Sequence, residues 1–213
     1  MELESMQLCK VILLLLLTAL IPAHAEDAKA NPVYKLDITA DDMTMGSKDA
    51  PVVIVEYSSL VCPHCATFHK DVFSKIEKEF IATGKVYYVH RDYVSNKVAL
   101  TGAKLNRCSG KDRYFVFLKV LFDKQESWAF KSDYESVLKN IAKLGGIGEE
   151  TFKKCMDDKA LEDKLIAITT DAHKNYKIEA TPTIFLNGEA MKSFFDYEDF
   201  KRAIELKLSA AAK

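Results

Sequence analysis

Two short apolar runs predict strands that are buried on both faces of a sheet. The first covers residues 51–57 and the second residues 86–91, and both are rich in β-branched and aromatic side chains. Between the two runs, large apolar residues recur at helical spacing: Phe68, Val72, Phe73, Ile76 and Phe80. Gly84 then ends the predicted helix. The order strand, helix, strand indicates a βαβ crossover with two parallel strands.

The second half of the chain changes from a helical pattern to a strand pattern. Residues 95–176 have apolar positions three and four apart and no convincing strand, so they predict a block of helices. Residues 183–187 predict a strand, Gly188 a hairpin turn and residues 191–195 the paired strand. A final amphipathic helix has its apolar face at Phe200, Ile204 and Leu208. The whole pattern predicts an α/β sandwich that is interrupted by helices.

The amino terminus has the pattern of a secretory signal peptide. An apolar run at residues 11–21 is followed by Pro22 and by the small-residue sequence Ala23-His24-Ala25. We therefore expect export and cleavage after Ala25. A membrane anchor is the alternative, but this run of 11 residues is well short of the roughly 20 that span a bilayer.

The composition limits the class of the expected mature chain. The full sequence is 48% hydrophobic and 29% charged, which is typical of a globular protein with a full core. Beyond residue 25 there are 29 basic and 29 acidic side chains, and this balance argues against a nucleic-acid partner. The polar residues 26–50 predict an extended arm. Cys9 is lost with the signal, which leaves an even number of cysteines, as suits an oxidising compartment: Cys62, Cys65, Cys108 and Cys155.

The strongest chemical signal is Cys62-Pro63-His64-Cys65, at the predicted turn from strand to helix. Two intervening residues let a disulfide close across one helical turn, and the first sulfur lies at the helix amino end, where free N–H groups favour a thiolate. Cys62 is therefore the expected exposed nucleophile and Cys65 the buried resolving thiol. Pro63 suits the first turn of a helix. A protonated His64 would lower the pKa of Cys62 further.

Two other interpretations of this cysteine pair remain open. A structural zinc site normally has a second pair of closely spaced ligands, whereas Cys108 and Cys155 are single and 47 residues apart. His69 and His90 lack ligand spacing as well, so we expect no metal. The other alternative is a structural disulfide without redox activity.

A second motif, Thr181-Pro182-Thr183, directly precedes the strand predicted at residues 183–187. Together with the Cys-x-x-Cys motif and the helical block, it resembles the thioredoxin superfamily. The resemblance implies a thioredoxin fold with a helical insertion, a cis bond before Pro182 and substrate contacts in that loop. Cys-Pro-His-Cys and the insertion resemble the DsbA family of exported oxidases within it. Glu56 stands where DsbA has a buried glutamate, and Trp128 follows an apolar run typical of alphaproteobacterial members.

The resemblance to DsbA also implies roles for single residues. Glu56, if it is buried beneath Cys65, would relay the proton of that thiol. Thr181 replaces the valine of the best-known members, and its hydroxyl can hydrogen-bond a sulfur or a substrate. Some members carry an extra cysteine pair, as Cys108 and Cys155 do here. We expect these two to form a structural disulfide in an oxidising compartment; two unpaired buried thiols are the alternative.

The implied organisation is a signal peptide at 1–25, an arm at 26–50 and a thioredoxin-like domain at 51–94 and 177–213, interrupted by a helical insertion at 95–176. The implied function is the introduction of disulfides into reduced, unfolded secreted proteins in the periplasm. The protein would be a monomer without a cofactor, reoxidised by a DsbB-like, quinone-linked membrane partner. The alternatives are a disulfide isomerase or reductase on the same fold, and a chaperone-like binding module with structural cysteines.

Overall fold

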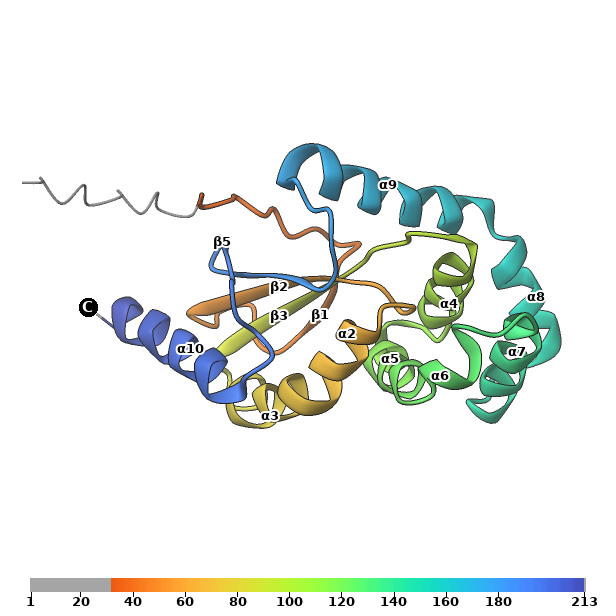
Figure 1. Cartoon of the computed structure of the whole chain (residues 1–213), viewed down its shortest axis with the longest axis horizontal. Helices are drawn as coiled ribbons and strands as arrows, with labels where there is room; N and C mark the ends of the chain where they lie inside the picture. Colours follow the sequence, from red (N-terminus) through yellow and green to blue (C-terminus); the bar gives the residue numbers. More distant parts are fainter. Residues whose placement is uncertain (1–31, 213) are drawn as a thin grey trace, which may run out of the picture. The chain divides into compact units, whose positions relative to one another are not determined.

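The structure is a computed structural model, and it describes residues 32–212. The predicted signal peptide and the first part of the predicted arm lie outside the described residues. Within them, the strands form one mixed sheet in the order β1-β3-β2-β4-β5 (Figure 1). The strands are β1 (Met43–Met45), β2 (Val52–Ser58), β3 (Val86–Asp92), β4 (Thr183–Leu186) and β5 (Glu189–Ala190).

The helices follow the order that the sequence predicts. One continuous helical segment with two wider π-helical turns joins β2 to β3: α2 (Pro63–Phe68), η1 (His69–Phe73), α3 (Ser74–Ile76) and η2 (Glu77–Ile81). The block between β3 and β4 is wholly helical: α4 (Lys97–Cys108), η3 (Lys111–Arg113), α5 (Tyr114–Asp123), α6 (Gln125–Trp128), α7 (Tyr134–Leu144), α8 (Glu149–Asp157) and α9 (Lys159–Tyr176). The chain then ends in α10 (Tyr197–Ala211). The predicted βαβ crossover is confirmed, since β2 and β3 are parallel.

The central strand β2 is covered on both faces, as its unbroken apolar pattern predicts. Val52 and Ile54 belong to the core that includes Phe68 and Phe200, from α2 and α10. Val55, by contrast, belongs to a core on the other face that includes Ala172 of α9. A third core lies among the helices α4 to α8, which gather beside the sheet in Figure 1. These layers hold β2 and the amino end of α2 in fixed positions.

The predicted extended arm contains a strand that the sequence pattern missed. Met43 to Met45 form β1, which pairs antiparallel with β3 through Met43 and His90. Three residues are too few to show a period, and Met43 is the buried member of the strand. The prediction of an arm without regular structure over residues 26–50 is therefore wrong at this point.

The carboxy-terminal hairpin is shorter than predicted. Asn187 and Gly188 have φ of 49° and 84°, the left-handed pair that a tight two-residue hairpin turn requires. A side chain at Gly188 would also bring its Cβ within 2.3 Å of the carbonyl oxygen of Tyr34. The paired strand is Glu189–Ala190, and the prediction of a strand at residues 191–195 is wrong. Only one backbone bond, from the N–H of Met191 to Ile184, extends the ladder further.

Within residues 32–212, no helix is both long enough and apolar enough to cross a bilayer.

Candidate active site

The first cysteine of the Cys-x-x-Cys motif lies at the amino end of α2. Cys62 has extended backbone angles and occupies the N-cap position, with Pro63 as the first helical residue. The backbone N–H groups of Cys65 and Ala66 donate to the Cys62 carbonyl oxygen. Cys62 is partly buried and Cys65 fully buried, and both are free thiols in this structure. The structure thus places an accessible and an inaccessible sulfur one helical turn apart.

The loop before β4 lies against Cys62, although 119 residues separate them in the sequence. The peptide bond between Thr181 and Pro182 is cis. Because β4 pairs with β2 through Tyr57 and Thr183, this loop and the start of α2 meet at one end of the sheet. The Cys62 thiol donates to the backbone carbonyl oxygen of Thr181 at 3.2 Å.

The neighbours of Cys62 favour its thiolate. A hydrogen bond from the Cys65 thiol is the largest influence, and partial burial opposes it. Hydrogen bonds from the Thr181 hydroxyl and from the backbone N–H groups of Cys65 and His64 act in the same direction as the first. Together they lower the pKa of Cys62 to about 5. The Thr181 carbonyl oxygen, in contrast, can accept a hydrogen bond only from the protonated Cys62 thiol. Thr181 can therefore bond the thiolate through its hydroxyl and the thiol through its carbonyl oxygen.

Cys65 has the opposite preference. Burial raises the pKa of its thiol well above the ordinary value of 9.0, and the hydrogen bond to Cys62 and the nearby charges of Cys62 and Glu56 raise it further. The two cysteines therefore divide their roles: Cys62 carries the negative charge and Cys65 keeps its proton.

Glu56 is a fully buried carboxylate whose two oxygens both have partners. Nε2 of His69 lies 3.1 Å from Oε1, and the hydroxyl of Tyr88 donates to Oε2 at 2.6 Å. Burial alone would raise the pKa of Glu56, but the charge of His69 and these hydrogen bonds outweigh it and lower the pKa to about 2. Glu56 is therefore an ionised, paired group that bears no proton near neutral pH.

His90 extends this buried network along β3. It is the register partner of Glu56 across the two parallel strands. Its Nδ1 lies 2.8 Å from the hydroxyl of Tyr114, which also donates to Asp92 at 3.1 Å. Burial lowers the pKa of His90 to about 4 and keeps the ring neutral.

One group of three side chains in the described part of the chain has the composition of a metal site. The possible ligand atoms of Glu56, His69 and His90 lie within 4.8 Å of one another. Neither active-site cysteine belongs to the group. Both oxygens of Glu56 and Nδ1 of His90 are already hydrogen-bonded to protein partners, which favours a hydrogen-bonded network here.

Gln125, at the start of α6, is a site residue that the sequence reasoning missed. Its side-chain amide donates to the carbonyl oxygens of Leu60 at 2.8 Å and Cys62 at 3.0 Å. Gln125 is 4% exposed. The helical block thereby holds the backbone of the loop that carries Cys62. No signal in the sequence distinguishes this glutamine from a solvent-exposed one.

The remaining residues that the sequence singled out are His64, the Cys108–Cys155 pair and Trp128. The His64 side chain is exposed and its ring centroid lies 5.5 Å from that of Phe195. Cys108, at the end of α4, is joined to Cys155 of α8 by a disulfide with a Cα–Cα distance of 6.1 Å. Trp128 is fully buried in the core of the helical block.

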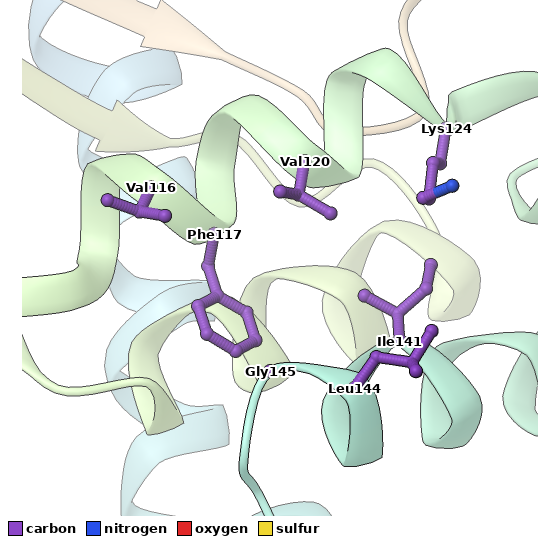
Figure 2. Close-up of a pocket in the computed structure, with 7 residues that line it drawn as sticks. All are labelled: Val116, Phe117, Val120, Lys124, Ile141, Leu144 and Gly145. Atoms are coloured by element: carbon purple, nitrogen blue, oxygen red, sulfur yellow. The ribbon is translucent and has the colours of Figure 1, made fainter.

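A separate apolar pocket lies within the helical block (Figure 2). Its volume is about 190 Å³, and it is lined by residues of α5 and α7 and their ends: Val116, Phe117, Val120, Lys124, Ile141, Leu144 and Gly145. A side chain on Gly145 would place its Cβ 2.3 Å from the Phe117 ring. The lining holds no nucleophile and no pair of titratable groups, so we assign it no chemistry.

Known proteins are similar to this chain in sequence. The family model described as Thioredoxin matches residues 39–206. A protein of Rickettsia typhi, provisionally named as a protein-disulfide oxidoreductase, is 34% identical over 181 residues, or 84% of this chain and 66% of that protein. This chain thus spans about two thirds of the length of that relative. Disulfide bond formation protein D of Bacillus subtilis is 30% identical over 175 residues, or 77% of this chain and 76% of that protein.

A solved structure extends the likeness to three dimensions. The crystal structure of Wolbachia pipientis alpha-DsbA1 has a TM-score of 0.78 and 29% identity, and the match covers 83% of this chain and 96% of that one. The sheet order, the helical block and the helix that begins at the cysteine pair all lie within the matched residues of the family model. The chain belongs to the thioredoxin family and is a DsbA-like member of it.

Proposed function

We propose that this chain is an exported thiol–disulfide oxidoreductase that introduces disulfide bonds into reduced secreted proteins. Cys62 and Cys65 are the redox pair, and the cis-proline loop at Thr181 and Pro182 receives the substrate. The names of the Rickettsia and Bacillus relatives support this activity. The signal-peptide pattern of the sequence supports export to the periplasm.

The observation that carries the proposal is the contrast between the two sulfurs. A pKa of about 5 at Cys62 means that the reduced enzyme holds a thiolate at neutral pH. Any interaction that stabilises this thiolate stabilises reduced over oxidised enzyme, so the Cys62–Cys65 disulfide is a good acceptor of electrons. DsbA is a standard example of this relation, and no potential is assigned to this chain.

The reaction proceeds by two thiol–disulfide exchanges. A substrate thiolate attacks the sulfur of Cys62, a substrate–Cys62 bond forms, and Cys65 leaves with the electron pair of the broken bond. The second substrate thiolate then attacks the substrate sulfur of this mixed disulfide, and Cys62 leaves as its stable thiolate. The substrate loses two electrons and gains a disulfide, while the enzyme ends as the dithiol. A quinone-linked, DsbB-like membrane protein would restore the disulfide.

Refolding of a reduced, unfolded disulfide protein tests the proposal. Oxidised wild-type protein should convert the substrate thiols to disulfides faster than glutathione disulfide does at the same concentration. A Cys62→Ser variant is the matched control and should give only the background rate. Equal rates for wild type and Cys62→Ser would overturn the proposed activity.

The redox state in the native cell separates the alternative functions. Rapid thiol trapping should find Cys62 and Cys65 oxidised and readily reduced by dithiothreitol. A reduced pair would instead support an isomerase or reductase. An oxidised pair that dithiothreitol does not reduce would support a binding module with structural cysteines.

A further inference from the structure

The proposed function requires a proton to reach a buried sulfur. When the Cys62–Cys65 bond breaks, Cys65 leaves as a thiolate at a position that is 0% exposed. Burial raises the pKa of this thiol well above 9.0, so the thiolate takes up a proton. On reoxidation the same proton must leave before Cys65 can attack. The inference about the path of this proton therefore rests on the proposed function.

Most titratable groups around Cys65 do not hold a proton that they can release at neutral pH, so none of them is the original source of the proton. Glu56 has a pKa of about 2 and bears none at neutral pH. Tyr88 is a phenol whose pKa is raised well above 10.0 by burial and by Glu56, so it does not release its proton. His90 has a pKa of about 4 and stays neutral. The remaining titratable partner of Glu56 is His69.

His69 contacts Glu56 in the buried hydrogen-bonded network and also lines a cavity. It follows Cys65 by four residues on one helical segment, so both lie on the same face of the helix. Its ring stacks on Phe122 with centroids 4.5 Å apart and an angle of 28°. This contact holds Nε2 against Glu56. His69 also lines a cavity of about 470 Å³, whose charged lining groups are Glu77, Asp112, Lys119 and Asp123.

We propose that His69 is the proton-transfer residue of Cys65, with Glu56 as the intermediary and the cavity beside α5 as the solvent end. The proton on Nε2 of His69 passes to Oε1 of Glu56, and Glu56 delivers a proton to Sγ of Cys65. Glu56 is again a carboxylate, Cys65 is a thiol and His69 is neutral. His69 then takes a proton from water in the cavity. Reoxidation reverses each transfer.

The test measures the pH dependence of one rate constant. Oxidised protein is reduced with excess dithiothreitol in a stopped-flow instrument, and the rate constant is expressed per dithiothreitol thiolate. His69→Gln keeps a hydrogen-bond donor for Glu56 but has no proton to transfer. We expect this variant to be reduced about 100-fold more slowly than wild type at low pH, which is the lower end of the range for general acid catalysis. The ratio of wild-type to variant rate should vary with pH, because a protonated imidazole can pass on a proton and the glutamine side chain cannot.

A matched control and a second variant complete the experiment. His173→Gln changes a histidine bonded to Tyr93, outside this network, and should follow the wild-type profile. His69→Ala opens the cavity, so added imidazole should restore its rate in a pH-dependent manner, provided that circular dichroism shows a folded protein. A constant ratio across pH, or no rescue of folded His69→Ala, would overturn the role of His69. Failure of the wild type to oxidise any substrate would instead overturn the proposed function.

Discussion

The charge state of Cys62 depends on neighbours in its own motif and on one residue that the fold brings from a distant segment. Cys65 is next to it in the motif, whereas Thr181 arrives through the pairing of β4 with β2. His64 contributes its backbone N–H, and its exposed imidazole adds a positive charge when protonated. Each of these groups stabilises the thiolate and hence the reduced enzyme.

Replacement of His64 by Ala should raise the pKa of Cys62. The backbone N–H remains in place, so only the effect of the imidazole is lost. A rise of about one unit corresponds to about 1.4 kcal/mol, and to a reduction potential about 30 mV lower. The variant would be a weaker oxidant. Titration of thiolate absorbance measures the pKa, and an unchanged or lower value would show that the imidazole has no such role.

Glu56→Gln should destabilise the protein in a pH-dependent way. The folded-state pKa of about 2 lies below the ordinary 4.5, so the ionised carboxylate stabilises the fold above pH 4.5 and loses this effect as the pH falls towards 2. We expect the free energy of unfolding to fall by about 1–3 kcal/mol at neutral pH, because the neutral amide of Gln is a weaker partner for His69 than the carboxylate. Urea unfolding from pH 7 to pH 2 should show the gap to wild type narrowing. A stability difference between wild type and Glu56→Gln that stays constant with pH would contradict the assignment of Glu56 as an ionised, paired carboxylate.

At the scale of elements, the helical block supports the active site as well as surrounding it. Gln125 of α6 holds the carbonyl groups of Leu60 and Cys62, which precede or cap α2. The disulfide between α4 and α8 joins two further helices of the block. The hydrogen bonds of Gln125 fix the loop that carries Cys62, and the disulfide fixes α4 and α8 relative to each other.

Gln125→Leu should destabilise the protein by about 1–3 kcal/mol, because the buried Leu60 carbonyl oxygen loses its side-chain donor and the part-buried Cys62 carbonyl oxygen loses one of three donors. The similar size of leucine keeps the packing near α6. Ser127→Ala, an exposed change in the same helix, is the control and should have little effect. Chemical unfolding measures both variants, and equal stabilities would argue against the supporting role of Gln125.

The Cys108–Cys155 disulfide should contribute stability and leave the redox centre unchanged. Its ends are 47 residues apart, and the chain-entropy relation gives an upper value of about 4 kcal/mol for such a loop. The Cys108→Ala/Cys155→Ala variant should therefore unfold at lower denaturant concentration with an unaltered pKa of Cys62. Peptide mapping without reductant should find the linked peptides. Recovery of both cysteines as free thiols in the purified protein would refute this bond.

At the scale of the whole molecule, redox state and stability are linked. The Cys62 thiolate exists only in the reduced protein. Its pKa of about 5, compared with an ordinary 9.0, adds folding stability that is fully present above pH 9 and is lost as the pH falls through 5. The disulfide form has no such contribution.

The reduced protein should therefore gain stability relative to the oxidised protein as the pH rises from 4 to 8. Thermal unfolding of both forms at several pH values measures this difference. His64→Ala should show a smaller gain, since its thiolate is less stabilised. A difference between the two forms that does not change with pH would show that the thiolate is not coupled to folding.

The sequence determined the features that depend on local pattern. Two β-branched runs, a helical period between them and a turn at Gly188 are short-range signals, and the structure has β2, β3, the helices and the turn where they predict. The cysteine pair at the start of α2 follows from the same local order. The β1 strand and the two-residue β5 are too short to carry a period, so the sequence pattern missed β1 and misplaced β5.

Tertiary structure decided everything that depends on pairing between distant segments. The register of β2 with β3 places Tyr88 and His90 around Glu56, and the helix between these strands brings His69 to the same carboxylate. A buried carboxylate is stable only with such partners, because burial alone favours its neutral form. Gln125 meets the Cys62 loop in the same way. No spacing along the chain encodes these contacts, since each arises where separate elements pack together.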